Sequence, residues 1–367
     1  MINVTKPFLP PLEDLIPLLE EIWASGVLSN NGPFHRQLEQ ALSERLGLEH
    51  LSLFCNATTA LITAQQALGI QGEVITTPYS FVATSHALRW MQNEPVFVDI
   101  EPGSLCIDPS RIEEAITPRT AAIMPLHCYG NTCSTRAIQE IADRHNLKII
   151  YDACHSFGVE DEAGTVLRHG DISVVSFHAT KVFNTFEGGL LVAHDREMKE
   201  KIDNLKNFGF VDETTVAESG LNGKMSEFNA AVGLLQLQHL DDITHRRGNW
   251  DALYRELLTP ISGITCVEPV RQSKRNYAYF PILVDEDCNQ SRDQLYETLK
   301  GHDIFPRRYF YPLISQFPMY SSYPSALSSN LPVATDTSER IICLPLYPDL
   351  EESDVRRIAD VIQAATQ

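Results

Sequence analysis

The sequence lacks the features that would place it in a membrane, in a secretory route or in a zinc-binding class. No apolar run is long enough to span a bilayer, and the N-terminus, MINVTKPFLPPLEDL, has no basic segment followed by an apolar stretch. The eight cysteines form no CxxC pair and, with the histidines, no zinc-type spacing. We therefore expect a cytoplasmic protein with reduced thiols, no metal and no membrane partner.

Positive charge is scarce in this chain. Its 29 lysines and arginines stand against 48 aspartates and glutamates, which gives a net charge of −19. Because phosphate backbones repel so acidic a chain, we expect no general nucleic-acid binding. If the ligand is an anion, a few local cations must hold it. The sequence also contains no GxxxxGK[ST], HExxH, GxSxG or strand-linked GxGxxG motif, which removes several common enzyme classes.

Short apolar runs alternate with helix-like stretches through the first two thirds of the chain. Strands are predicted at residues 51–54, 73–76, 95–98, 121–126, 147–151, 172–177 and 190–193. Helices are predicted between most of them, for example at 59–68, 80–92 and 134–145. Continuous apolar strands separated by helices are typical of a largely parallel sheet that is covered on both faces. We therefore predict a large α/β domain over residues 1–240.

The pattern changes near residue 226. Residues 226–257 have helical periodicity and predict one long helix or two joined helices. A strand at 277–284, a helix at 291–300 and an amphipathic C-terminal helix follow. These elements predict a smaller α+β domain over residues 241–367, which the long helix joins to the first domain.

Polar residues that could carry chemistry follow the fifth and sixth predicted strands. Asp152 and His155 come after the fifth, and Ser176 lies at the end of the sixth, five positions before Lys181. In parallel sheets, ligands bind beyond the carboxyl ends of the strands. Asp152 is either a helix cap or a partner for a protonated ring nitrogen, and His155 is either structural or a donor to the same ligand. Lys181 is either solvated or a Schiff-base lysine with a depressed pKa.

Two further segments allow two interpretations each. Ala57 and Thr58 open a helix where free N–H groups could hold a phosphate, but a simple threonine cap explains the same residues. Tyr79 could cover a planar ligand or pack in the core. Gly188 and Gly189 follow the lysine and would let the next strand begin close to that site.

Together these residues supply a phosphate cradle, a flat aromatic side chain, an acid for a pyridinium nitrogen and a lysine for an aldehyde. Pyridoxal 5′-phosphate (PLP) uses a lysine Schiff base and an acidic partner to its ring nitrogen. The sequence contains no competing constellation. We therefore predict that the chain binds PLP.

The order of these motifs resembles the DegT/DnrJ/EryC1/StrS group of PLP-dependent sugar aminotransferases, within fold type I of PLP enzymes. NATTAL is similar to the group's Asn-Gly-Thr-x-Ala-Leu motif, YDACHS to its Asp-x-Ala-Gln/His motif, and SFHATK…EGG to its Ser-Phe-x-x-x-Lys…Gly-Gly motif. Further resemblances are carried by SGVLSNNGPFHRQLEQALSERLG, TTPYSFVAT, GLNGKMSEFNAAVGLLQL and ICLPLYPDLEESDV. The resemblance covers nearly the whole chain and implies an α/β fold of the PLP-transferase type I.

The resemblance implies roles for the residues around the cofactor ring. Lys181 would form the Schiff base with PLP and move the proton. Asp152 would pair with the pyridinium nitrogen, His155 would bond the ring hydroxyl oxygen, and Tyr79 would stack on the ring. Lys181 also separates the chain from relatives that have histidine at this position and carry out dehydration, so the chain is identified as a transaminase.

Other residues would hold the cofactor phosphate, according to the same resemblance. Ala57, Thr58 and Ser176 would bind it from one subunit, and Asn222 would reach it from the neighbouring subunit, which makes a homodimer obligatory. Ala57 departs from the group's usual glycine but keeps its N–H group. Lys224 departs from a frequent arginine, which weakens a bidentate phosphate contact.

The implied reaction moves an amino group from L-glutamate to a nucleotide-linked keto-sugar. The lysine segment most resembles the branch that converts dTDP-4-keto-6-deoxyglucose to dTDP-4-amino-4,6-dideoxyglucose in deoxysugar biosynthesis, as for O-antigen and lipopolysaccharide. Amination at C3, a UDP-linked substrate and a non-catalytic regulator are open alternatives. Candidates for contact with the sugar nucleotide are Lys224, Arg307, Arg308, Tyr309 and Tyr311, which surface charge and small-domain packing explain equally well.

Overall fold

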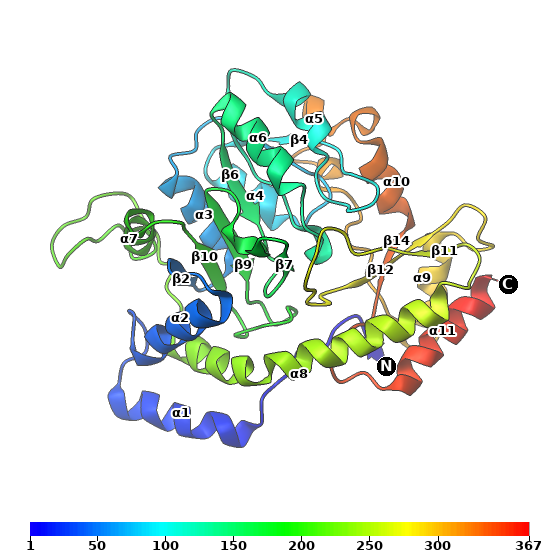
Figure 1. Cartoon of the computed structure of the whole chain (residues 1–367), viewed down its shortest axis with the longest axis horizontal. Helices are drawn as coiled ribbons and strands as arrows, with labels where there is room; N and C mark the ends of the chain where they lie inside the picture. Colours follow the sequence, from blue (N-terminus) through cyan, green and yellow to red (C-terminus); the bar gives the residue numbers. More distant parts are fainter. Residues whose placement is uncertain (367) are drawn as a thin grey trace.

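A seven-stranded sheet forms the centre of the protein, described from a computed structural model in which residues 1–366 are placed (Figure 1). Its strand order is β2-β10-β9-β6-β5-β3-β4. These strands are β2 (Leu51–Phe54), β3 (Glu73–Thr76), β4 (Glu94–Phe97), β5 (Thr120–Ile123), β6 (Lys148–Asp152), β9 (Ile172–Ser176) and β10 (Gly189–Val192). Each overlaps one of the apolar runs, so the seven predicted strands are confirmed.

Six of the seven strands run in the same direction. The neighbouring pairs among β9, β6, β5, β3 and β4 are parallel, whereas β10 is antiparallel to both β2 and β9. The largely parallel sheet predicted from the sequence is therefore confirmed. Because the carboxyl ends of β6 and β9 lie at one edge, the residues that follow these two strands meet there.

Helices lie against both faces of this sheet, and further helices belong to the C-terminal part of the chain (Figure 1). They are α1 (Leu12–Ser25), α2 (Pro33–Leu46), α3 (Ala57–Ala67), α4 (Ala83–Trp90), α5 (Pro109–Ile112), α6 (Thr135–His145), α7 (Arg196–Leu205), α8 (Glu227–Leu258), α9 (Arg292–Gly301), α10 (Pro332–Arg340) and α11 (Glu352–Thr366). The remaining strands are β1 (Ile2–Asn3), β7 (Glu160–Asp161), β8 (Gly164–Thr165), β11 (Ile264–Cys266), β12 (Phe280–Val284), β13 (Ile304–Phe305) and β14 (Ile341–Leu344).

Successive residues of a strand enter different parts of the core, because side chains alternate between the two faces of a sheet. Val174 of β9 and Leu191 of β10 pack in a cluster with apolar residues of α3 and α7. Their neighbours Val175 and Leu190 pack instead with residues of α2 and α8. The strands are thus buried on both faces, which explains why their sequences are apolar throughout.

The C-terminal part is built around α8 and a three-stranded antiparallel sheet in the order β11-β12-β14. The helix α8 is one continuous element of 32 residues that passes through residue 240, so the alternative of two joined helices is wrong. The division at residue 240 therefore falls inside a helix and stays a prediction. The N-terminal strand β1 pairs in parallel with β13, which places the start of the chain beside the C-terminal elements (Figure 1).

Length alone does not make α8 a membrane helix. Its sequence carries charged side chains along the helix, including Asp241, Arg246 and Asp251. Within residues 1–366, no helix combines the length and the apolar composition needed to cross a membrane.

Candidate active site

A cavity of about 590 Å³ opens where the parallel strands end. Its walls come from the segments that follow β2, β3, β5, β6 and β9, and from Tyr279, Tyr309 and Phe310 of the C-terminal part. Seven of the residues predicted for the site line it: Ala57, Thr58, Asp152, His155, Ser176, Lys181 and Tyr309. The fold therefore brings together side chains that are far apart in the sequence.

Lys181 lies in the loop between β9 and β10 and is half-buried. Its Nζ donates a hydrogen bond to the hydroxyl of Tyr279 at 3.1 Å. Burial lowers the pKa of Lys181, but Tyr279, Cys154 and Asp152 together outweigh burial, and the net shift of this pKa is upward. This direction is opposite to the depressed pKa that the sequence left open as one alternative for Lys181.

Asp152 is a buried carboxylate at the end of β6. Its Oδ2 accepts a hydrogen bond from the Thr84 hydroxyl at 2.7 Å, and its Oδ1 accepts one from the backbone N–H of Cys154 at 3.1 Å. Neither partner is a cation, and among residues 1–366 no ion pair involves Asp152. No helix follows β6 directly, so the alternative of a helix cap does not apply. The carboxylate is thus placed to stabilise a cationic group that enters the cavity.

His155 is held as a neutral imidazole. Its Nδ1 accepts a hydrogen bond from the backbone N–H of Tyr129 at 3.1 Å, so the proton lies on Nε2. Burial, reinforced by the nearby charge of Lys181, lowers the pKa of His155 well below its usual value. The ring is fixed by Tyr279 and Phe310, whose ring centres lie 4.8 Å and 5.9 Å away. His155 therefore offers one N–H donor to a ligand in the cavity.

The start of α3 presents backbone N–H groups to the cavity. Asn56 caps this helix by accepting a hydrogen bond from the backbone N–H of Thr59 at 2.9 Å, so the threonine cap considered from the sequence is wrong. Gly189 of β10 lies directly against this turn, because a Cβ there would be 2.7 Å from the carbonyl carbon of Asn56 and 2.8 Å from the nitrogen of Ala57. The predicted close approach of the strand that follows Lys181, β10, is therefore confirmed. Ser176 at the end of β9 lines the same cavity.

Tyr79 lies in the core and does not line the cavity. Its side chain is fully buried, and its hydroxyl is hydrogen-bonded to the Tyr129 hydroxyl at 2.7 Å and to the carbonyl of Tyr309 at 3.0 Å. The predicted stacking of Tyr79 on a planar ligand is therefore wrong. Phe81, two positions later in the same turn, lines the cavity and is 60% exposed. The sequence offered two aromatic residues in one turn, and only burial distinguishes them.

Asn222 and Lys224 lie outside the cavity of their own chain. Asn222 is exposed and pairs through its backbone with Asn207. The Nζ of Lys224 donates a hydrogen bond to the side chain of Asn207 at 2.9 Å and lies 4.5 Å from the ring centre of Phe208. Lys224 lines neither of the cavities around the predicted site in its own chain, so its predicted contact with the sugar nucleotide stays a prediction. The exposure of Asn222 leaves its predicted role toward a neighbouring subunit open.

A second cavity of about 270 Å³ adjoins the first. The two share Ser80, Phe81, Tyr309 and Phe310, and the second is lined in addition by Arg307, Arg308 and Tyr311. Arg308 donates a hydrogen bond to Asp293 at 2.7 Å, so its charge is already paired. The guanidinium of Arg307 has no hydrogen-bond or ion-pair partner in the part of the chain that the structure describes. Arg307 is thus the available cation beside the shared wall.

The sequence interpretation missed two residues that contact the predicted catalytic groups. Thr84, which holds Asp152, lies in the segment TTPYSFVAT that was singled out for its aromatic residues. Tyr279, which holds Lys181, is 98 positions away from it and sits in a stretch that looked like an ordinary strand. Nothing in the spacing of either residue indicated its contact. Among the described residues, no group of His, Cys, Asp or Glu side chains is arranged to hold a metal ion.

Residues 12–363 match the model of the DegT/DnrJ/EryC1/StrS aminotransferase family. The chain belongs to this family. Two relatives in the family are each named dTDP-4-amino-4,6-dideoxy-D-glucose transaminase. The protein of Shigella dysenteriae is 56% identical over 362 residues, which cover 99% of this chain and 98% of the relative. The protein of Escherichia coli is 52% identical over 363 residues, which cover 98% of each chain.

Solved structures of similar proteins have the same fold. DesI, crystallised in the presence of its TDP-sugar product, is 34% identical with a TM-score of 0.95, over 100% of this chain and 93% of DesI. NtdA from Bacillus subtilis, with bound cofactor PMP, is 28% identical with a TM-score of 0.89, over 100% of this chain and 86% of NtdA. These likenesses confirm the predicted fold class, an α/β fold of the PLP-transferase type I.

Proposed function

We propose that this chain is a PLP-dependent aminotransferase that moves an amino group from L-glutamate to dTDP-4-keto-6-deoxyglucose and forms dTDP-4-amino-4,6-dideoxyglucose. The observation that carries the proposal is that Lys181, Asp152 and His155 line one cavity beside the start of α3. The choice of sugar is supported by two relatives that bear this product's name and are more than half identical over nearly their full length.

The groups that line the cavity fit PLP part by part. The free N–H groups at the start of α3 suit a phosphate, with Ala57, Thr58 and Ser176 as its holders. The carboxylate of Asp152, which has no cationic partner, suits a protonated ring nitrogen. The Nε2–H of His155 suits the ring hydroxyl oxygen. Phe81 replaces Tyr79 as the candidate for the face of the ring.

The side chains of the cavity have distinct tasks in this reaction. When bound, PLP supplies an aldehyde that takes up amines and a ring that accepts electron density from a carbon as it loses a proton. Lys181 would provide the amine that holds the cofactor. Once this amine is free, it would act as the base that moves the proton of the amino donor's Cα. Asp152 stabilises the positive charge of the ring nitrogen, and His155 fixes the orientation of the ring.

The second cavity is the proposed subsite for the nucleotide diphosphate. Arg307 contributes a guanidinium without an internal partner, and such a group binds phosphate oxygens well. Tyr309, which lines both cavities, and Tyr311 supply aromatic surface for the sugar and the base. This arrangement would place the sugar in the first cavity, near Lys181, and the diphosphate beyond Phe81.

A homodimer with shared active sites is part of the same proposal. Large apolar side chains of the N-terminal segment are exposed on the isolated chain, among them Trp23 at 77% and Leu12 at 66%. Exposed apolar patches on a protein surface are typical of interaction sites. Asn222 is exposed outside its own cavity, as a residue that completes the neighbouring subunit's phosphate site would be.

The substrate is tested by incubating the purified protein with PLP, L-glutamate and a panel of keto-sugars. The panel contains dTDP-4-keto-6-deoxyglucose, its 3-keto isomer and a UDP-linked 4-keto-sugar, and NMR of each product locates the new amine. We expect the amine at C4 of the dTDP-sugar and no turnover by Lys181→Ala. Preferred amination at C3 or of the UDP-sugar would replace the proposed substrate. Absence of any amination by correctly folded, PLP-loaded protein would favour the alternative that the chain is a non-catalytic regulator.

The shared site is tested with two defective variants in one dimer. Lys181→Ala and Asn222→Ala chains, with different affinity tags, are co-expressed, and the heterodimer is purified through both tags. One of its two sites then has both residues, so we expect about half of the wild-type activity, whereas each homodimer is nearly inactive. An inactive heterodimer, a fully active Asn222→Ala homodimer or an active monomer would contradict the shared site.

Cytoplasmic location and a place in O-antigen or lipopolysaccharide biosynthesis stay predictions.

A further inference from the structure

Tyr279 makes the only hydrogen bond that the described residues give to the Lys181 amine. The distance from Nζ to the phenolic oxygen is 3.1 Å, and Nζ lies 5.8 Å from the centre of the tyrosine ring. The contact is therefore made to the hydroxyl and not to the face of the ring. Tyr279 precedes β12, so it belongs to the C-terminal part, whereas Lys181 follows β9 of the central sheet.

The ring of Tyr279 is held in place by other aromatic side chains. His155 meets it edge-on with ring centres 4.8 Å apart, and Tyr129 lies 5.3 Å away at a tilt of 53°. Tyr309 approaches it edge-on at 5.9 Å. Packing on several sides restricts rotation of the ring, so its hydroxyl stays directed at Lys181.

The backbone on the N-terminal side of Tyr279 is also held. The buried guanidinium of Arg247, on α8, donates hydrogen bonds to the carbonyls of Tyr277 at 2.9 Å and Ala278 at 2.8 Å. The buried side chain of Asn276 donates to the carbonyl of His155 at 2.8 Å and accepts from the N–H of Ala278 at 3.1 Å. These bonds tie the segment before β12 both to the long helix and to the loop that carries Asp152 and His155.

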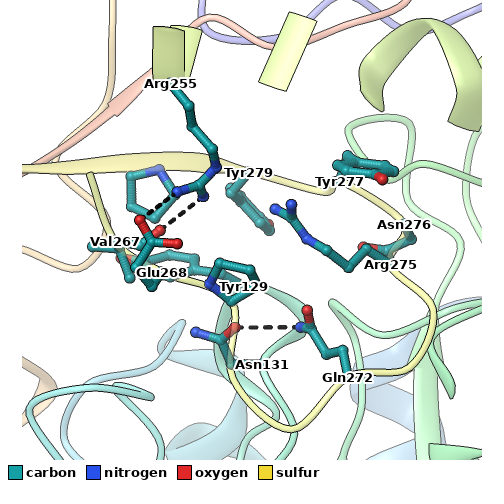
Figure 2. A pocket seen from close by; sticks show the side chains of 12 residues that line it. Tyr129, Asn131, Arg255, Val267, Glu268, Gln272, Arg275, Asn276, Tyr277 and Tyr279 are labelled. Carbon is teal, nitrogen blue, oxygen red and sulfur yellow. Dashed lines mark hydrogen bonds and ion pairs between the residues drawn. The ribbon is translucent and has the colours of Figure 1, made fainter. Parts of the chain in front are cut away.

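Tyr279 lines two cavities. One contains Lys181, and the other is a hollow of about 20 Å³, the size of roughly one water molecule. Figure 2 shows Tyr279 and Tyr129 among the side chains around this hollow, with Arg275 and Asn276 of the same segment. Tyr279 is therefore shared between the linings of both hollows.

Charge and burial give this hydroxyl a definite effect on Lys181. Against the effect of burial, Tyr279, Cys154 and Asp152 raise the pKa of Lys181. Together with burial, the charge of Lys181 in turn lowers the pKa of His155, and it works to lower that of Tyr309. Burial favours the neutral amine and works to lower the pKa of Lys181, whereas the Tyr279 hydroxyl works to raise it. Burial also raises the pKa of the phenol, so Tyr279 keeps its proton at neutral pH. It can accept from an ammonium group and donate to a neutral amine.

We propose that Tyr279 is a positioning residue that holds the Nζ of Lys181 whenever this amine is free, and that orients it for proton transfer. This role presupposes that Lys181 is the reacting amine, as proposed above. It assigns to the C-terminal part a direct contact with the catalytic lysine. A hydrogen bond to a charged, buried amine also fixes how readily that amine takes up a proton.

The test measures the lysine itself, without cofactor or sugar. The protein freed of PLP is trace-acetylated with acetic anhydride between about pH 7 and pH 11, and the extent of reaction at Lys181 is read by peptide mass spectrometry. Tyr279→Phe removes only the hydroxyl. We expect its titration midpoint at Lys181 to move to lower pH and the acetylation rate at pH 8 to rise about tenfold, because burial is no longer opposed by the hydrogen bond.

Tyr129→Phe is the matched control, since it removes a hydroxyl from the same aromatic cluster that does not contact Lys181. Its titration midpoint at Lys181 should equal that of the wild type. An unchanged midpoint in folded Tyr279→Phe, or an equal shift in both variants, would overturn the role of Tyr279. Because no substrate enters this measurement, a wrong keto-sugar leaves its result intact. In the same way, an unchanged midpoint leaves the proposed transamination standing.

Discussion

Replacement of Gly189 by alanine is expected to disturb the proposed phosphate site without touching any predicted catalytic side chain. Gly189 is the first residue of β10, and a Cβ on it would lie 2.7 Å from the carbonyl carbon of Asn56, 2.8 Å from the nitrogen of Ala57 and 2.9 Å from the Asn56 oxygen. All three atoms belong to backbone at the start of α3. A side-chain rotation cannot relieve the contact, so the strand and the helix must move apart.

The size of this effect follows from the distances. Ordinary contact begins near 3.4 Å, so the two segments must separate by about 0.7 Å. Overpacking of this kind destabilises a fold by about 1–3 kcal/mol. A shift of that size also lengthens the hydrogen bonds from the α3 N–H groups to a bound phosphate, and the loss of one such charge-assisted bond weakens binding by about 1.5–3 kcal/mol. We therefore expect the Kd for PLP to rise roughly 10- to 100-fold.

Two measurements check this prediction. The urea midpoint of the PLP-free protein reports the free energy of unfolding, and a titration followed by absorbance reports the Kd for PLP. Gly103→Ala is the control, because a Cβ at Gly103 would meet nothing within 4 Å and its φ is not positive. If Gly189→Ala matched Gly103→Ala in both measurements, the close approach of β10 to α3 would not support the cofactor site.

Three other changes test separate parts of the structure. Glu227→Gln should lower the free energy of unfolding, measured in urea titrations, by about 2–3 kcal/mol. The reason is that the buried carboxylate accepts hydrogen bonds from the backbone N–H groups of Phe34 at 2.8 Å and His35 at 2.9 Å, at the start of α2. Equal urea midpoints for the variant and the wild type would contradict this. Burial, reinforced chiefly by Lys206, lowers the pKa of His35 to about 4, so below about pH 6.5 only the unfolded chain takes up a proton there. Between pH 6.5 and pH 5, protonation of His35 in the unfolded chain should lower the free energy of unfolding by about 2 kcal/mol. His35→Gln should remove this part of the pH dependence, as measured by urea titrations at each pH. Arg307→Ala should raise KM for the dTDP-sugar about tenfold with little change in kcat. The control Arg136→Ala, on the surface of α6, should change neither constant. A fall in kcat alone would place Arg307 away from the diphosphate.

The sheet was predictable because its strands are buried on both faces. Runs such as those at β6 and β9 must be continuously apolar, and this pattern survives in a single sequence. The pairing of β1 with β13 was not predictable, since each strand has only two residues and their partners are about 300 positions apart. The continuity of α8 was also open, because helical periodicity does not show whether a helix bends.

The candidate site was predictable where a residue directly follows a strand. Asp152 and Ser176 end β6 and β9, so the sheet itself carries them to one edge. Tyr79 was misplaced because core and cavity lie only two residues apart in that turn, and hydrophobicity does not distinguish Tyr79 from Phe81. The upward pKa shift of Lys181 depends in part on Tyr279, which arrives from the C-terminal part. Only the folded chain reveals such long-range contacts.

The role of Lys181 is tested most directly by finding the lysine that carries the cofactor. The protein is loaded with PLP and reduced with borohydride, which fixes the cofactor irreversibly to the amine it is bonded to, and the labelled peptide is identified by mass spectrometry. We expect a single pyridoxyl group on Lys181, and none on folded Lys181→Ala. A label on another lysine, or folded wild-type protein that takes up no label, would contradict this role.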